Sequence, residues 1–113
     1  MIKNIPIAEG VVLADLVSYQ HGQVVSRTLA QNNQTSLTLF AFPEGEGLSA
    51  HSSPSDALVL ILDGQAAIEV GDKEMTLGAG ETVVMPANVP HALRAIEPFK
   101  MLLIIIRGAS EIS

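Results

Sequence analysis

The chain has 113 residues, of which 48% are hydrophobic and 16% are charged, a balance typical of one folded globular domain. Its 6 basic and 12 acidic side chains give a formal net charge of -6, which argues against partnership with nucleic acid or anionic membranes. The chain has no cysteine, which excludes disulfides, thiolate metal sites and a cysteine nucleophile. Because neither a signal peptide nor a membrane-spanning stretch is visible, we expect a soluble cytoplasmic protein.

The predicted secondary structure consists of short strands. Residues 7–16 show partial helical spacing, and a strand or an irregular segment fits them equally well. From residue 23 onward, β-type segments alternate with turns rich in Gly, Pro, Asn and Asp. The predicted strands are 23–30, 35–42, 57–62, 65–70, 73–77, 81–85, 91–96 and 99–107. Short strands at this spacing predict an all-β sandwich or barrel in a single domain, residues 1–113.

Two of these segments, 57–62 and 101–106, are apolar on both faces. In an antiparallel barrel one face of a strand lines the interior, so the other face must also be covered. A second sheet of the same chain or a second subunit would provide this cover. The second alternative predicts a homodimer.

A histidine lies between regularly spaced glycines in residues 45–64. Gly45 is followed by five residues and then by His51, and Gly64 ends the stretch. One such stretch is a weak signal, because a histidine six residues after a glycine occurs often by chance.

In residues 80–95, Gly80 is followed by five residues and then by Pro86, and four further residues precede His91. Together the two stretches resemble motif 1 (about 45–64) and motif 2 (about 80–95) of the cupin family. The resemblance implies a double-stranded β-helix, the RmlC-like jelly-roll barrel, and it also favours a homodimer. It says less about function, because one fold can host many chemistries.

The sequence departs from the family pattern at the metal ligands. A metal-binding cupin typically uses three His and one Glu, and here Ser53 replaces one His and Ala57 replaces the Glu. Only His51 and His91 remain of the four ligands. Asn88 stands where the motif usually has Gly, a mild change because Asn tolerates positive φ.

Two imidazoles without an anionic ligand make a weak site for a divalent ion. Asp56 lies one residue before the Glu position, and a slip of one residue ordinarily turns a side chain to the opposite face. The loop at 52–55 can absorb that slip, so a divalent transition metal bound by His51, His91 and Asp56 is an alternative. His21 would join them only if its strand ran beside the pocket.

With its metal ligands replaced, a cupin barrel keeps a largely apolar cavity with a few polar anchors. We expect His51 and His91 to be those anchors. The predicted lining residues are Phe40, Phe42, Ser53, Val59, Ile61 and Met85.

Three functions follow, and the favoured one is a small-molecule-binding protein without an assigned reaction. The first alternative is a metal-dependent oxygenase or isomerase that uses Fe, Mn, Ni or Zn. The second is a metal-free isomerase, epimerase or lyase, with one His as base and either Tyr19 or the other His as acid. The only nearby cations are Arg27, Arg94 and Lys100, which disfavours a nucleotide-sugar substrate.

Overall fold

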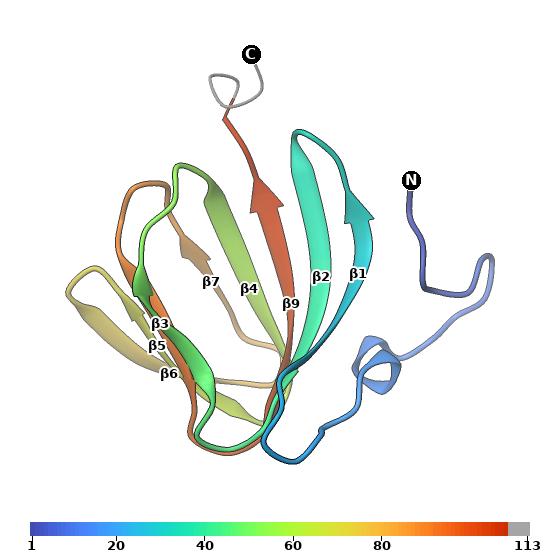
Figure 1. Cartoon of the computed structure of the whole chain (residues 1–113), viewed down its shortest axis with the longest axis horizontal. Coiled ribbons are helices and arrows are strands. Elements are labelled where there is room, and N and C mark those ends of the chain that lie inside the picture. The colour runs from blue at the N-terminus through green and yellow to red at the C-terminus, as the bar shows by residue number, and fades with distance from the viewer. Residues whose placement is uncertain (109–113) are drawn as a thin grey trace.

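The computed structural model describes residues 1–108, which form nine β-strands and one short 3-10 helix (Figure 1). The elements are η1 (Leu13–Leu16), β1 (Val25–Gln31), β2 (Thr35–Phe42), β3 (Gly47–His51), β4 (Asp56–Asp63), β5 (Gln65–Val70), β6 (Lys73–Gly78), β7 (Thr82–Met85), β8 (His91–Ala95) and β9 (Phe99–Ile106). Eight of the strands lie where the sequence predicts them. The sequence pattern does not predict β3, and residues 7–16 contain η1 rather than a strand.

The strands form two antiparallel sheets that face each other as a jelly-roll barrel (Figure 1). The five-stranded sheet has the order β1-β2-β9-β4-β7, and the four-stranded sheet has the order β3-β8-β5-β6. The loop at 43–46 joins β2 to β3 at one end of the barrel, and the loop at 52–55 joins β3 to β4 at the other. We call the second end, where β3 ends and β8 begins, the mouth.

Strand alternation explains the interior. Along β4, Ala57, Val59 and Ile61 are buried, while the intervening leucines are only partly buried, as a period of two requires. At the end opposite the mouth, Phe42 stacks on Phe99 with ring centroids 4.8 Å apart. Burying each such side chain contributes about 1.5–3 kcal/mol, so this packed end anchors the barrel.

The N-terminal segment covers part of the outer face of the five-stranded sheet. Its buried residue Val17 packs with Leu39 and Ala41 of β2, and Leu13 and Leu16 of η1 pack against the same cluster. The outer face is therefore covered by a short irregular segment, and only at one end. No helix among the residues that the structure describes is long and apolar enough to cross a membrane.

Two glycines allow the backbones to approach closely. A Cβ on Gly47 would lie 2.1 Å from the Leu93 carbonyl oxygen, and a Cβ on Gly64 would lie 1.9 Å from the Pro98 carbonyl oxygen. Gly64 also has a φ of +75°, a conformation that side chains with a Cβ rarely adopt. Asn88 has a φ of 66°, which confirms that Asn accepts the conformation expected at this motif position.

Candidate functional site

The two motif histidines lie side by side at the mouth. His51 ends β3, His91 begins β8, and the two residues are direct partners in the antiparallel pairing. Their ring centroids are 4.5 Å apart, with the rings inclined at 69°. His51 is exposed, whereas His91 is only 6% exposed. The fold therefore brings together two imidazoles, one from each of the two motif stretches.

Hydrogen bonds to the backbone determine which ring nitrogen faces outward. The Nδ1 of His51 lies 2.9 Å from the Ser49 carbonyl oxygen, and the Nδ1 of His91 lies 3.1 Å from the Val89 carbonyl oxygen. Because a carbonyl oxygen only accepts, each Nδ1 carries the hydrogen. The neutral rings therefore both present the lone pair of Nε2, which can accept a hydrogen bond, take up a proton or bind a metal.

The surroundings of the pair at the mouth are mostly apolar. Val70 is the partner of His91 across β5 and β8. Ala57 pairs with Met85 on one side and with Ile105 on the other, at the start of β4. All four apolar residues belong to the barrel core or pack against it. Two polar nitrogens above an apolar wall are the usual composition of a site for a small organic molecule.

The donor set does not fit a firmly bound metal ion. Within residues 1–108, no group of three or more His, Asp or Glu side chains is arranged to hold one. The hydroxyl of Ser53 faces the Ser55 backbone at 3.4 Å, and Ala57 offers only a methyl group. Moreover, β3 ends at His51, so strand alternation does not carry Ser53 to the same face as this histidine. Tight sites need three or four good donors, and this mouth supplies two.

Asp56 has a different role from that of a metal ligand. It is exposed, and its neighbour Ala57 is buried, so alternation turns the carboxylate away from the barrel interior. Its Oδ1 accepts a hydrogen bond of 2.8 Å from the backbone N–H of Ala87. Nearby, the Asn88 N–H donates to the Ser53 carbonyl oxygen at 2.7 Å. These two bonds join the loop after His51 to the loop before His91.

The predicted pocket residues lie at different depths. Phe42, Val59 and Ile61 have no exposed surface, and Met85 is 2% exposed, so these side chains are packed core. Phe40 and Ser53 are partly buried.

Nearer the surface of the barrel, other partly buried hydrophobic residues pack against the same core: Leu48, Val70, Leu103 and Ile105. Strand alternation identifies the inward face of a strand but not how deeply each inward residue is buried, so the sequence did not reveal these residues.

The other residues singled out in the sequence lie elsewhere. His21 lies exposed in a turn closed by the Gln20–Gln23 bridge. Tyr19 packs against the outer cluster under the N-terminal segment and donates its hydroxyl hydrogen to Asp63. Burial and this hydrogen bond raise the pKa of Tyr19 above its ordinary value of 10.0. A tyrosine held in this way does not act as an acid beside the two histidines.

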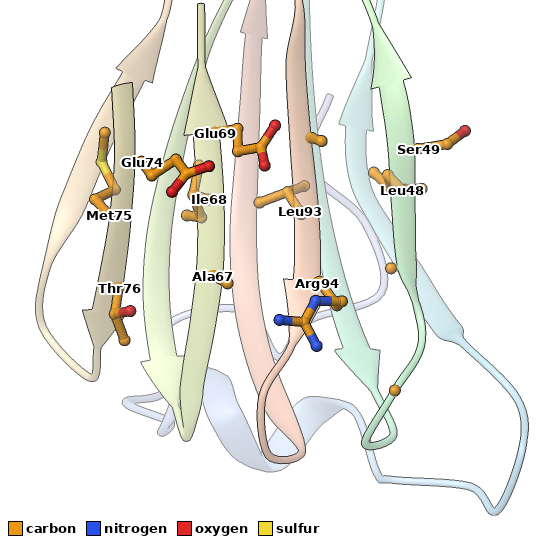
Figure 2. A pocket seen from close by; sticks show the side chains of 13 residues that line it. Leu48, Ser49, Ala67, Ile68, Glu69, Glu74, Met75, Thr76, Leu93 and Arg94 are labelled. Atoms are coloured by element: carbon orange, nitrogen blue, oxygen red, sulfur yellow. The ribbon is translucent and has the colours of Figure 1, made fainter. Parts of the chain in front are cut away.

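A groove of about 730 Å³ lies on the outer face of the four-stranded sheet, away from the two histidines (Figure 2). Gly47, Ala67 and Ala92 give it a low floor, since they have little or no side chain. Figure 2 shows Glu69 and Glu74 side by side, with Arg94 further along the sheet. No ion pair or hydrogen bond engages these three side chains within the described residues. This groove was not predicted from the sequence, although small residues at outward strand positions indicate it.

Comparisons with known proteins identify the family and support the jelly-roll fold. The family model described as a cupin domain matches residues 38–105, which include both histidines and the barrel core. A conserved protein of unknown function from Streptococcus pyogenes is 40% identical, with a TM-score of 0.91 over 95% of this chain and 94% of that one. A cupin superfamily protein from Desulfitobacterium hafniense is 34% identical, with a TM-score of 0.91 over 96% and 99% of the two chains.

More distant structures share only the fold. KdgF from a Halomonas species is 16% identical, with a TM-score of 0.72 over 88% of this chain and 95% of that one. None of the curated proteins compared with the chain matches it.

Proposed function

The chain belongs to the cupin family, and from that premise we propose that it binds a small organic molecule at the mouth of its barrel. The observation that carries this proposal is the paired orientation of His51 and His91, whose Nδ1 atoms are engaged by the backbone and whose Nε2 atoms are not. An apolar wall beside two fixed polar groups binds and orients a ligand at the same time.

The chemistry of the mouth narrows the class of ligand. Two neighbouring Nε2 lone pairs accept hydrogen bonds from two neighbouring donors, as in a diol, a sugar or a hydroxy acid. The partly buried Val70 and Ile105 would cover an apolar part of the same molecule. We therefore propose a small hydroxylated ligand with one apolar side.

This proposal can be tested by NMR on the imidazole nitrogens. Protein labelled with ¹⁵N is titrated with a panel of probes: a hexose, a vicinal diol and a hydroxy acid. A binding probe should shift the Nε2 signals of His51 and His91, and its affinity should fall at least about tenfold in each of His51→Ala and His91→Ala.

The control variant is Arg94→Ala, which changes the outer groove and leaves the mouth intact. A probe that binds equally well to both histidine variants but is lost in Arg94→Ala would contradict the proposal and assign the ligand to the groove. If no probe in the panel shifts either Nε2 signal, the proposed ligand class is wrong.

A metal-free acid–base reaction is a second candidate, because the two imidazole rings lie 4.5 Å apart between centroids. One ring would take a proton from the ligand and the other would return it. Incubation of each bound probe in D₂O tests this candidate. Deuterium incorporation that is lost in either histidine variant would support it, whereas binding without exchange would leave binding as the function.

A further inference from the structure

A row of paired residues on the four-stranded sheet connects the two histidines of the mouth to a lysine. From β3 to β6 the members of this row are His51, His91, Val70 and Lys73. Two residues further along β6, Met75 packs against the barrel core, and Leu77 beyond it is buried in that core. Because side chains alternate along a strand, Lys73 lies on the same, inward face of β6. The register therefore places Lys73 at the inner rim of the mouth.

The turn that precedes Lys73 is attached to the loop that precedes His91. Gly71 and Asp72 form this turn between β5 and β6, and the Gly71 N–H donates to the Pro90 carbonyl oxygen at 2.8 Å. One strand lies between β6 and β8, so the backbones at Lys73 and His91 are roughly 10 Å apart. A lysine side chain, with its flexible four-carbon stem, spans much of that distance. A small ligand between the two residues completes it.

The charge of Lys73 has no partner among residues 1–108. Lys73 is exposed, and no ion pair or hydrogen bond of its side chain is formed there, not even with the adjacent Asp72. Its other neighbour, Glu74, lies on the outer face of the sheet, opposite Glu69. The carboxylate of Asp56 already accepts a hydrogen bond from a backbone N–H. An anionic ligand at the mouth would therefore meet an unpaired ammonium group.

The cations that the sequence suggested near the histidines lie elsewhere. Arg94 is on the outer face of the four-stranded sheet. The side chains of Arg27 and Lys100 donate to backbone carbonyl oxygens of the N-terminal segment at 3.2 and 2.6 Å. Arg107 follows β9 at the mouth end, but it donates to a backbone carbonyl oxygen in the β1–β2 turn at 3.5 Å. Lys73 is thus the cation that the register brings to the row of the two histidines.

The facing sheet adds an uncharged polar group at the same end. Its first inward row, from β2 to β7, consists of Ser36, Ile105, Ala57 and Met85. Ser36 is only 7% exposed, and no hydrogen bond within residues 1–108 engages its hydroxyl. Among these residues no polar side-chain atom is both fully enclosed and without a hydrogen bond, so the Ser36 hydroxyl borders space that water or a ligand can enter. A polar ligand therefore meets hydrogen-bonding groups on both walls.

We propose that the mouth selects a small hydroxy acid, whose carboxylate binds the Lys73 ammonium group while its hydroxyl groups donate to the Nε2 atoms of His51 and His91. This inference rests on the proposed function and narrows its ligand class from hydroxylated molecules in general to anions. A charge-assisted hydrogen bond is about twice as strong as one between neutral groups, and a neutral sugar or diol cannot form it with Lys73. Because the whole chain has a net charge of -6, preference for an anion requires such a local cation.

Two matched probes test this selection at neutral pH: glycerate and its uncharged amide, glyceramide, which share a vicinal diol. The ¹⁵N signals of His51 and His91 follow binding at the mouth. Wild-type protein should bind glycerate about five- to tenfold more tightly than glyceramide. In Lys73→Gln the affinity for glycerate should fall to that for glyceramide, whereas the affinity for glyceramide should stay the same. Because Lys73 is exposed, this variant should unfold in urea as wild type does.

Arg94→Gln is the matched control, because it removes one positive charge from the outer face of the same sheet. It should keep the wild-type preference for glycerate. Equal affinities for the two probes in wild type, or a preference that survives in Lys73→Gln, would overturn the role of Lys73 and leave the proposed function standing. A preference that Arg94→Gln also abolishes would reflect net charge alone and would overturn it too. If neither probe shifts the histidine signals, the proposed function fails and this inference fails with it.

Discussion

At the scale of single residues, the chemistry of the mouth depends on which polar atoms already make hydrogen bonds within the protein. The Nδ1 of each histidine is hydrogen-bonded to a backbone carbonyl oxygen, and the Asp56 carboxylate accepts a hydrogen bond from the Ala87 N–H. The Nε2 atoms of both imidazoles therefore stay available for the proposed ligand, whereas the Asp56 carboxylate accepts a hydrogen bond that joins two loops. The three residues differ in this way although all of them belong to the two motif stretches.

Asp56 should consequently matter for stability and not for metal affinity. We expect Asp56→Ala to lower the free energy of unfolding by about 1 kcal/mol, because it removes a hydrogen bond to a charged acceptor at an exposed site. Urea denaturation measures this loss. Calorimetric titration with Ni²⁺ should give the same weak affinity for Asp56→Ala and wild type, and a lower affinity for His51→Ala. A large loss of Ni²⁺ affinity in Asp56→Ala would instead indicate a site with two histidines and a carboxylate.

Gly64 should be the least replaceable of the positive-φ glycines at the ends of the strands. Gly45→Ala introduces a Cβ at a φ of +86° into open space, so it should cost about 1–2 kcal/mol of backbone strain. Gly64→Ala introduces a similar backbone strain and, in addition, a clash between the new Cβ and the Pro98 carbonyl oxygen. It should therefore lower the free energy of unfolding by more than about 3 kcal/mol. Urea unfolding of the two variants checks this order. Equal losses would mean that the backbone at Pro98 shifts easily.

The pairing of His51 and His91 was expected through the resemblance to the cupin motifs, because spacing alone does not bring residues 40 positions apart together. The sequence could not predict that Asp56 would be engaged by Ala87, since that bond joins residues 31 positions apart through a loop. Nor could it separate Ile61, fully buried, from Ile105, partly buried and nearer the mouth, because both lie at inward positions. Depth along a barrel depends on how two sheets diverge, which strand periodicity does not contain.

At the scale of elements, the strands differ in how clearly the sequence defines them. The segment TSLTLFAF alternates cleanly and gives β2 with the bounds expected. In contrast, β3 has the sequence GLSAH, which has one large apolar residue and begins with glycine. Its pairing with β8 makes it a strand, so only the tertiary fold reveals it.

The connection of the N-terminal segment to the barrel depends on one group of polar contacts. The Tyr19 hydroxyl donates a hydrogen bond to Asp63. The Nζ of Lys100 donates to the Ala14 carbonyl oxygen at 2.6 Å, and it lies 5.0 Å from the centroid of the Tyr19 ring. Burial and Asp63 raise the pKa of Tyr19, so the folded state favours the neutral phenol. This contribution to stability is fully present below pH 10.0 and is lost progressively as the pH rises above it.

We therefore expect Tyr19→Phe to be less stable than wild type at neutral pH, and the difference to shrink above pH 10.0 as the wild-type tyrosine ionises. Thermal unfolding from neutral to alkaline pH measures both. A difference that stays constant with pH would show that Tyr19 contributes through packing alone.

At the scale of the whole molecule, polar and apolar surfaces are distributed unevenly between the two sheets. The four-stranded sheet turns Glu69, Glu74 and Arg94 outward, whereas the five-stranded sheet turns Leu58 and Ile104 outward. The apolar segments 57–62 and 101–106 predicted the second pattern, but they did not indicate which element covers the outward face. The structure shows that the N-terminal segment covers part of this outward face. This cover depends on where the segment folds back onto the sheet, which the strand pattern does not indicate.

The bonds from Asp56 to Ala87 and from Asn88 to Ser53 join the two rims of the mouth. The loop that follows His51 and the loop that precedes His91 therefore restrain each other. If a ligand binds at the mouth as proposed, these two loops have less conformational entropy to lose, so the hydrogen bonds between them favour binding without touching the ligand.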